Sequence, residues 1–321
     1  MQVLPHAAGP AAAPGGVHRV ELAAACVVLS VRAFPADMTS KKPGRLRSLV
    51  ARTGRVLGWA WRLLLILLIV DAFYLAVTWP DWAALTKGAV SKSRFIRDYE
   101  ARVAEDKKLP RLRWQPVPLS AMPKHLTRAV ILAEDGRFYG HSGFDLQAFR
   151  EAMDYNFEKG RLARGASTIS QQTVKNLFLS SSRNPLRKWH ELVLTWGMEQ
   201  HLKKHRILEI YLNVAEFGRG IYGVQAAAQA YFGVNVESLT PSQAAELAAT
   251  LPGPTKHNPA TRTRFFDKHA AKILSLLQRY PGDAADTVNA PGGGPAPALE
   301  AIRDENGLAP VEDRSFGPDR P

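Results

Sequence analysis

The sequence predicts a mainly α-helical protein that carries a single membrane-spanning helix near its N-terminus. Three observations support this fold class. An apolar run surrounds residue 65, apolar side chains recur at spacings of three and four along residues 91–280, and strand-like alternation is nearly absent. Of the 321 residues, 46% are apolar and 22% are charged, which is the composition of a chain with a globular core. This composition excludes wholesale disorder.

Residues 1–37 are rich in Ala, Pro and Gly and show no sustained helical or strand period. Their short apolar piece, from Val27 to Val31, cannot span a bilayer. Met38 begins a Met-Thr-Ser-Lys-Lys sequence typical of a natural start, so we interpret residues 1–37 as disordered or as an upstream extension. The single cysteine, Cys26, excludes an intramolecular disulfide and a zinc site built on several cysteines.

A membrane anchor is predicted over residues 56–79. Its centre, residues 63–77, is interrupted only by Asp71, and tryptophans lie at both ends of the run, where their rings favour the headgroup region. Asp71 would cost on the order of 3 kcal/mol in mid-bilayer, but the leucine-rich body outweighs this cost. The alternative is a cleaved signal peptide, but no small-residue cleavage site follows the run.

The distribution of charge predicts the orientation of this anchor. Residues 38–55 form a basic segment with six Lys and Arg residues and no acid, whereas Asp81 follows the apolar run. The positive-inside rule therefore puts the N-terminus in the cytoplasm and the rest of the chain outside it. The net charge of +13 suggests an anionic partner, and anionic lipid at the inner leaflet accounts for the chief basic run. We therefore expect no nucleic-acid partner.

Residues 91–280 are predicted to form one mostly helical domain of catalytic size. Apolar residues recur at helical spacing before residue 134, again around 207–212, and again from Ala244 to Leu251, where Pro252 and Pro254 end the pattern. Residues 281–321 hold seven Pro, six Gly and few large apolar side chains, so a disordered tail is predicted there.

Two clusters of polar residues in this domain carry candidate chemistry. Glu134 and Asp135 directly follow an apolar run, and partial burial prepares a carboxyl group for acid or base work; the alternative is a charge pair at a helix end. The second cluster suits a sugar or phosphate site, because hydroxyls and amides bind hydroxyls and a lysine binds phosphate. Its members are Ser167, Gln171, Gln172, Lys175 and Asn176. The alternative is a capped helix with Ser167 or Thr168 at its N-cap.

Two further clusters follow along the chain. Arg183, Arg187 and Glu191 place cations beside a carboxylate, although Arg187 and Glu191 are also spaced as an ordinary ion pair on a helix surface. Residues 204–213 lead into a Gly218-x-Gly220-x-x-Gly223 sequence, but no strand precedes it, so a packing helix and a tight turn are favoured over a dinucleotide site.

Taken together and in order, these clusters resemble the peptidoglycan glycosyltransferases, glycosyltransferase family 51. The matching motifs are E-D-x-x-F-x-x-H-x-G from Glu134, G-x-S-T-I-x-Q-Q-x-x-K-N from Gly165, R-K-x-x-E from Arg187, K-x-x-I-L-E-x-Y-L-N from Lys204, and A-A-x-L-A-A-x-L-P-x-P from Ala244. The resemblance covers roughly residues 95–275. With one anchor and no Ser-x-x-Lys motif of a transpeptidase, the chain resembles the monofunctional members.

The resemblance implies a lysozyme-like glycosyltransferase domain with a small membrane-dipping subdomain around residues 140–165. It implies an enzyme on the outer face of the bacterial inner membrane that polymerises lipid II onto an undecaprenyl-pyrophosphoryl glycan, with inversion at the sugar. Glu134 would be the base and Glu191 the second glutamate, while Lys175, Arg183 and Arg187 would neutralise the pyrophosphate. Asp135, Ser167, Gln171, Gln172 and Asn176 would contact the substrate.

Cofactors and partners follow from the same resemblance. The resemblance implies that no cofactor is required. It is also compatible with a divalent cation such as Mg²⁺ at Glu191 and with protein partners from cell-wall synthesis or division. The main alternative function is a lysozyme-like hydrolase or lytic transglycosylase, which would need an acid for an alcohol leaving group but no dense cation cluster. A non-enzymatic membrane scaffold is the second alternative.

Overall fold

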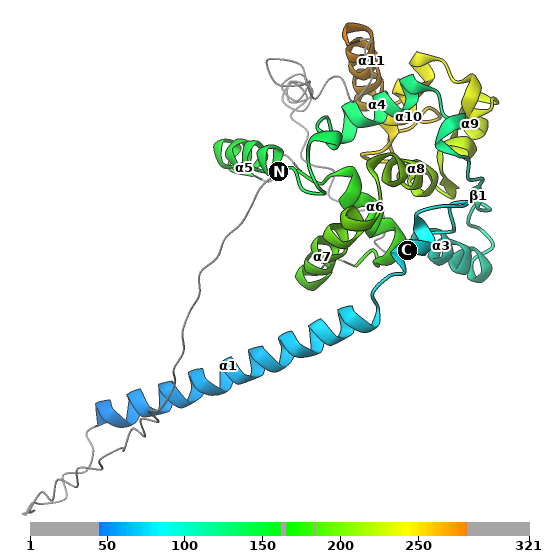
Figure 1. Cartoon of the computed structure of the whole chain (residues 1–321). Coiled ribbons are helices and arrows are strands. Elements are labelled where there is room, and N and C mark those ends of the chain that lie inside the picture. The colour runs from blue at the N-terminus through cyan, green and yellow to red at the C-terminus, as the bar shows by residue number, and fades with distance from the viewer. Residues whose placement is uncertain (1–44, 162–164, 183, 281–321) are drawn as a thin grey trace, which may run out of the picture. The chain divides into compact units, whose positions relative to one another are not determined.

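The structure is a computed structural model that describes residues 45–161, 165–182 and 184–280 (Figure 1). Our predictions for residues 1–37, residues 281–321 and Arg183 lie outside the described residues. The chain divides into two compact units, Met1–Val70 and Asp71–Pro321. The fold class is confirmed, because a long apolar helix precedes a mainly helical domain.

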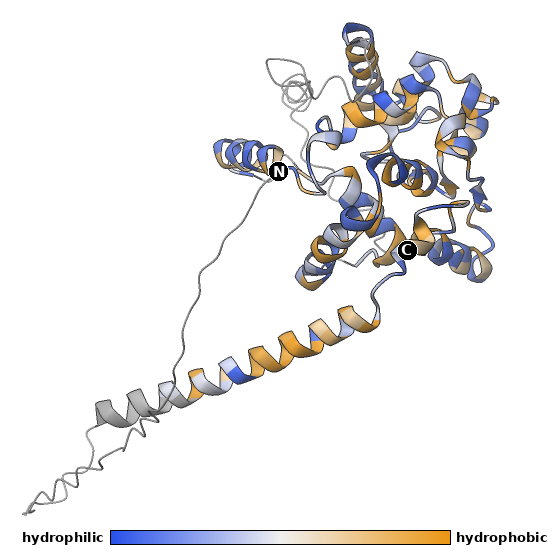
Figure 2. Ribbon diagram, in the orientation of Figure 1, coloured by the Kyte–Doolittle hydropathy of each residue, from blue (hydrophilic) through white to orange (hydrophobic). Residues whose placement is uncertain are grey.

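The long helix α1 (Arg45–Val77) contains the apolar stretch that the sequence predicts. In the described part of the chain, Val56–Val77 is long and apolar enough to cross a membrane (Figure 2). At a rise of 1.5 Å per residue, these 22 residues extend about 33 Å, close to the thickness of a bilayer's hydrocarbon core. Large apolar side chains such as Leu67 and Ile69 are exposed, as expected of a helix that is solvated by lipid.

Asp71, the acid in this apolar stretch, is the first residue of the second unit and is paired with other residues of that unit. Asp71 Oδ1 lies 2.6 Å from His190 Nε2, and Trp189 Nε1 donates a hydrogen bond of 3.1 Å to Asp71 Oδ2. The His190 ring also stacks on Tyr74, with ring centroids 5.5 Å apart. These contacts give Asp71 polar partners and so reduce the cost of placing a carboxylate near the end of an apolar helix.

The second unit is built mainly from helices that pack on one another, with one small sheet. Its elements are α2 (Trp82–Leu85), α3 (Arg94–Glu105), β1 (Arg113–Trp114), η1 (Leu119–Ala121), α4 (Lys124–Glu134), η2 (Phe138–Gly140), α5 (Leu146–Lys159), α6 (Ile169–Phe178), α7 (Pro185–His201), α8 (Lys204–Val214), β2 (Glu216–Gly218), β3 (Ile221–Tyr222), α9 (Val224–Phe232), η3 (Val236–Ser238), α10 (Pro241–Thr250) and α11 (Arg264–Arg279). Helix α4 packs against α10 and α11, and α6 packs against α7 and α8 (Figure 1).

The three short strands form a sheet that periodicity did not predict. They lie in the order β1-β3-β2, with β1 parallel and β2 antiparallel to β3. The glycine-rich motif forms the turn between β2 and β3. A Cβ at Gly220, where φ is +77°, would meet the Tyr99 ring, and one at Gly223 would lie 2.8 Å from the carbonyl oxygen of Asn213. The glycines therefore serve a tight turn, as their sequence context predicts.

Local sequence explains where the helices of the site begin. Thr168 caps α6 in a capping box with Gln171, and Asn184 caps α7 with Pro185 at its first position. Helix α4 buries nearly its whole apolar run, from Ala129 to Ala133, so that Glu134 lies at the point where the buried helix ends.

Candidate active site

Glu134 is the first residue of the site, and its carboxylate is held from a neighbouring helix. Gln172 of α6 donates a hydrogen bond of 2.7 Å from Nε2 to Glu134 Oε2. The other end of that amide, Gln172 Oε1, accepts a bond of 3.2 Å from the hydroxyl of Tyr211 in α8. Glu134 and Gln172 are half-buried, whereas Tyr211 is fully buried. Burial, followed by the negative charges of Glu134 and Asp135, raises the pKa of Tyr211 well above its ordinary value, so the phenol stays protonated.

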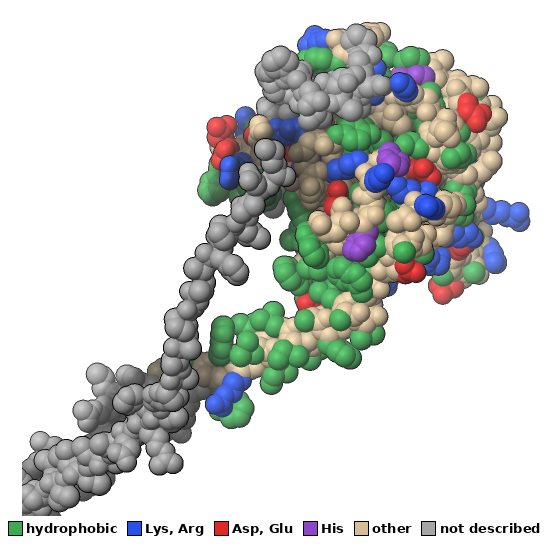
Figure 3. Space-filling view, in the orientation of Figure 1, with side chains coloured by type: hydrophobic (Ala, Val, Ile, Leu, Met, Phe, Trp, Pro, Cys, Tyr) green, Lys and Arg blue, Asp and Glu red, His purple; other side chains and the backbone are tan. Residues whose placement is uncertain are grey.

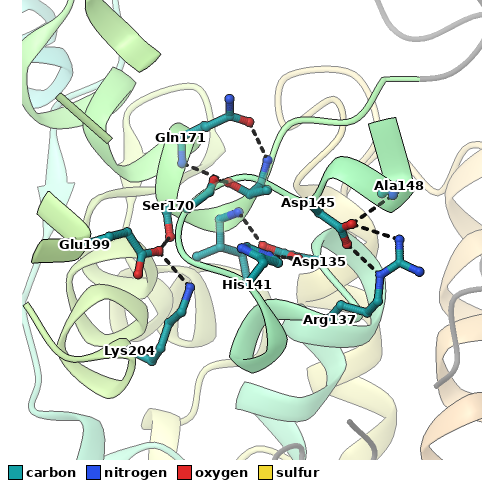
Figure 4. A network of polar contacts seen from close by, with 12 residues as sticks. Asp135, Arg137, His141, Asp145, Ala148, Ser170, Gln171, Glu199 and Lys204 are labelled. Atoms are coloured by element: carbon teal, nitrogen blue, oxygen red, sulfur yellow. Dashed lines mark hydrogen bonds and ion pairs between the residues drawn. The ribbon is translucent and has the colours of Figure 1, made fainter. Parts of the chain in front are cut away.

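Asp135 closes the loop that follows α4 (Figure 4). Its Oδ1 lies 2.9 Å from His141 Nε2, and its Oδ2 accepts a bond of 3.0 Å from the backbone N–H of Ile169, at the start of α6. With both oxygens engaged and the residue buried, Asp135 joins α4 to α6 in this structure. We predicted that this carboxylate would contact the substrate, but in the structure it is buried and bonded within the protein.

The same loop is tied to α5 by a second acid. Arg137 binds both carboxylate oxygens of Asp145, at 2.7 and 2.9 Å, and Asp145 also caps α5 through the N–H of Ala148. Burial alone would raise the pKa of Asp145, but the hydrogen bonds from Arg137 and Ala148 bring it below its ordinary value. The carboxylate therefore stays charged, and the loop between α4 and α5 is held at both of its ends.

The second predicted cluster divides between the interior and the site. Gln171 is 6% exposed, and its amide accepts the N–H of Thr168 in the capping box, so it serves the helix start. Ser167 is exposed just before α6, while Lys175 and Asn176 are half-buried. Because Gln172, Lys175 and Asn176 are three and four residues apart, they lie on one side of α6. That side is the one from which Gln172 reaches Glu134.

The third predicted cluster forms a partly buried ion-pair group on α7. Arg187 Nη1 lies 2.9 Å from Glu191 Oε2, and Lys188 Nζ contacts Glu191 Oε1. Glu191 is only 3% exposed, so this is not the solvated pair that its spacing alone suggests. Among the residues that the structure describes, Arg187 Nε is buried and has no hydrogen-bond partner.

A further polar group was missed by the sequence analysis. The Glu199 carboxylate accepts hydrogen bonds of 2.5 Å from Ser170 Oγ and 2.7 Å from Lys204 Nζ (Figure 4). The Lys204 ammonium also lies 4.4 Å from the centroid of the Phe138 ring. Lys204 opens the fourth motif, whose pattern favours a packing helix, so the sequence does not indicate this separate contact. Glu199 had no signal beyond lying two turns after Glu191 in α7.

Two groups of side chains place potential ligands for a divalent cation close together or beside the cation cluster. Asp135, His141 and Asp145 have potential ligand atoms within 4.8 Å of one another, but Asp145 is already neutralised by the Arg137 guanidinium. At Glu191, both oxygens contact cations of α7, which a metal ion would have to displace. Neither donor set fits a divalent cation as arranged.

Helices α5 and α7 expose large apolar side chains. On α5 they follow one face, and on α7 they include two tryptophans; the residues are Leu146, Phe149, Met153, Phe157, Leu186, Trp189 and Trp196. Phe157 is 80% exposed. Figure 3 shows hydrophobic side chains gathered over α7. A soluble surface rarely presents this many large apolar groups, so these faces are suited to contact with lipid.

Comparison with known proteins extends the similarity beyond the motifs. A family model described as Transglycosylase matches residues 104–278, which include every residue of the site. The biosynthetic peptidoglycan transglycosylase of Methylobacillus flagellatus is 39% identical over 228 residues, covering 68% of this chain and 96% of that protein. The proteins of the same name from Bordetella avium and Azoarcus sp. are 41% identical over 239 residues and 42% identical over 214 residues. The match to the Bordetella avium protein covers 73% of this chain and 96% of that protein. The match to the Azoarcus protein covers 65% of this chain and 92% of that protein.

Proposed function

This chain belongs to the peptidoglycan transglycosylase family, and from that premise we propose that it polymerises lipid II into β-1,4-linked glycan strands and releases undecaprenyl pyrophosphate. The observation that carries the proposal is the position of Glu134. A half-buried carboxylate is held by Gln172 on the side of α6 that also presents Lys175, and the ion-pair group of Arg187, Lys188 and Glu191 lies on the neighbouring helix α7.

The proposed reaction needs a base and a set of cations. The 4-hydroxyl of the acceptor sugar loses its proton to Glu134 and attacks C1 of the donor sugar, whose bond to the pyrophosphate oxygen breaks. Attack opposite the leaving group converts an α-linked donor into a β-linked product. The departing pyrophosphate carries away the bonding electrons and needs neutralisation more than protonation. Lys175, Arg187 and Arg183 are the cations that we assign to it.

Glu191 has a supporting part in this proposal. Its buried carboxylate holds Arg187 and Lys188 and so orients the cations that face the pyrophosphate. The cation group also argues against a glycan-cleaving enzyme, since an alcohol leaving group needs a proton donor and gains little from added positive charge.

The test is to incubate the purified full chain with lipid II and to analyse the products. We expect long glycan strands and released undecaprenyl pyrophosphate. Cleavage of isolated sacculi without polymerisation would replace the proposal by a hydrolase or lytic transglycosylase. If neither substrate is turned over, the chain is a scaffold and the proposal is wrong.

We further propose that the second unit works on the outer face of the inner membrane, because a basic segment with six Lys and Arg precedes the apolar helix. A reporter fused after Pro321 is expected to be active only when it is of a type that functions outside the cytoplasm. Activity of a cytoplasmic reporter at the same position would contradict both the orientation and the assigned substrate.

The exposed face of α5 is expected to contact the membrane that holds the substrate. Replacing Phe149 and Phe157 together by Ser should lower polymerisation about tenfold when lipid II is presented in bilayer vesicles, because apolar contact with lipid is lost. The rate in detergent should change little. Glu158→Ser, an exposed polar position on the same helix, is the matched control. An equal loss in vesicles and in detergent would show that these phenylalanines serve something other than the membrane.

A further inference from the structure

The Tyr211 hydroxyl lies at the buried end of a chain of hydrogen bonds that reaches Glu134. Tyr211, in α8, is 1% exposed and donates to Gln172 Oε1 at 3.2 Å; Gln172, in α6, donates from Nε2 to Glu134 Oε2 at 2.7 Å. These two hydrogen bonds thus join α8, α6 and α4, of which α6 and α8 pack directly together. In this series of hydrogen bonds, Glu134 is the half-buried end and Tyr211 is the fully buried end.

The direction of these bonds follows from the donors and acceptors available. An ionised carboxylate only accepts, so the NH₂ group of Gln172 has to face Glu134 and its oxygen has to face Tyr211. A flipped amide would bring Gln172 Oε1 against a carboxylate oxygen, which is repulsive. The protonated Tyr211 hydroxyl, as a buried donor to Oε1, stabilises the productive orientation of the amide and leaves the flipped one without that bond.

We propose that Tyr211 is a positioning residue, which acts through the amide of Gln172 to hold the Glu134 carboxylate in the orientation that receives the acceptor's proton. This inference rests on the function proposed above for Glu134. Tyr211 does not touch the substrate in this account, since its hydroxyl is buried behind Gln172. Without the hydroxyl, only Glu134 orients the amide, so the amide is held less firmly and the fraction of enzyme with a correctly held base falls.

The chain offers two matched controls for the loss of one tyrosine hydroxyl. Tyr222 is fully buried on β3, and its hydroxyl has no hydrogen-bond partner among the described residues. The Tyr231 hydroxyl donates to the carbonyl oxygen of Phe217 at 2.7 Å, in a contact that belongs to the β2 and α9 region. Tyr222→Phe and Tyr231→Phe therefore report the cost of the same chemical change at positions away from Glu134.

The first experiment compares these variants in steady-state polymerisation of lipid II by the full chain. Tyr211→Phe is expected to lower kcat about tenfold with little change in KM or melting temperature, while the two control variants keep the wild-type kcat. In a Gln172→Met background, Tyr211→Phe should have no further effect, because the amide through which it acts is gone. Equal kcat for Tyr211→Phe and Tyr222→Phe, or losses that simply multiply in the double variant, would overturn the inference.

A second measurement does not depend on turnover. The side-chain amide signals of Gln172, assigned by their loss in Gln172→Met, can be followed by NMR in the detergent-solubilised full chain. We expect Tyr211→Phe to shift these signals and Tyr222→Phe to leave them unchanged. An inactive wild-type enzyme would refute the proposed function, whereas unchanged Gln172 signals in Tyr211→Phe would refute the positioning role by itself.

Discussion

Glu134→Gln is expected to lower the rate of glycan polymerisation by about 10²- to 10⁴-fold, because the substituted side chain cannot take the proton of the acceptor hydroxyl. An amide keeps the size of the carboxyl group and can still accept the hydrogen bond from Gln172, so the fold and lipid II binding should survive. The adjacent acid cannot substitute, since both oxygens of Asp135 are bound by His141 and Ile169.

The measurement is the initial rate of polymer formation, together with lipid II binding and the melting temperature of the same preparations. Glu237→Gln, the same change at an exposed position on η3, is the matched control and should leave all three unchanged. Near-wild-type turnover by Glu134→Gln would remove this residue from the mechanism.

Lys175→Ala is expected to reduce turnover by roughly 100-fold, or about 3 kcal/mol of barrier, by removing one cation from the developing charge on the pyrophosphate. The side chain is half-buried on the face of α6 that carries Gln172, so its loss should cost little stability. Arg183→Ala is expected to act in the same way, on the strength of the sequence pattern alone.

The effect should appear in kcat, with the melting temperature close to that of the wild type. Lys107→Ala, an exposed lysine in the turn after α3, controls for the loss of one positive charge and should be fully active. If Lys175→Ala and Arg183→Ala both polymerise lipid II normally, these cations belong to a solvated surface and the pyrophosphate site lies elsewhere.

Several features of the fold were predictable because they depend on neighbours along the chain. The apolar run predicted a span over residues 56–79, and the structure has an apolar helical stretch at Val56–Val77. The polar residues before Ile169 were compatible with either a ligand site or a helix capped by Ser167 or Thr168, and Thr168 does cap α6 with Gln171. Side-chain period and capping are local properties, so a single sequence carries them.

The roles of individual polar residues were less predictable. Asp135 and Gln171 were grouped with the substrate contacts because they fall within polar motifs, yet the structure engages both in holding α4 and α6. The spacing of Arg187 and Glu191 indicated an ion pair, but it did not indicate that Glu191 would be buried. A motif shows which side chains occur together, whereas burial depends on what packs over them.

The sequence alone was sufficient to predict a mainly helical protein with an apolar helix of spanning length, and its motifs resemble those of the peptidoglycan transglycosylases. Which polar groups meet depends on the tertiary structure. Gln172 reaches Glu134 across 38 positions, and His190 reaches Asp71 across 119. Such pairs form because helix packing brings distant segments together, and no local period or spacing encodes them. The hydroxyl of Tyr211 was assigned a part in the site for the same reason, since packing of α8 on α6 places it behind Gln172.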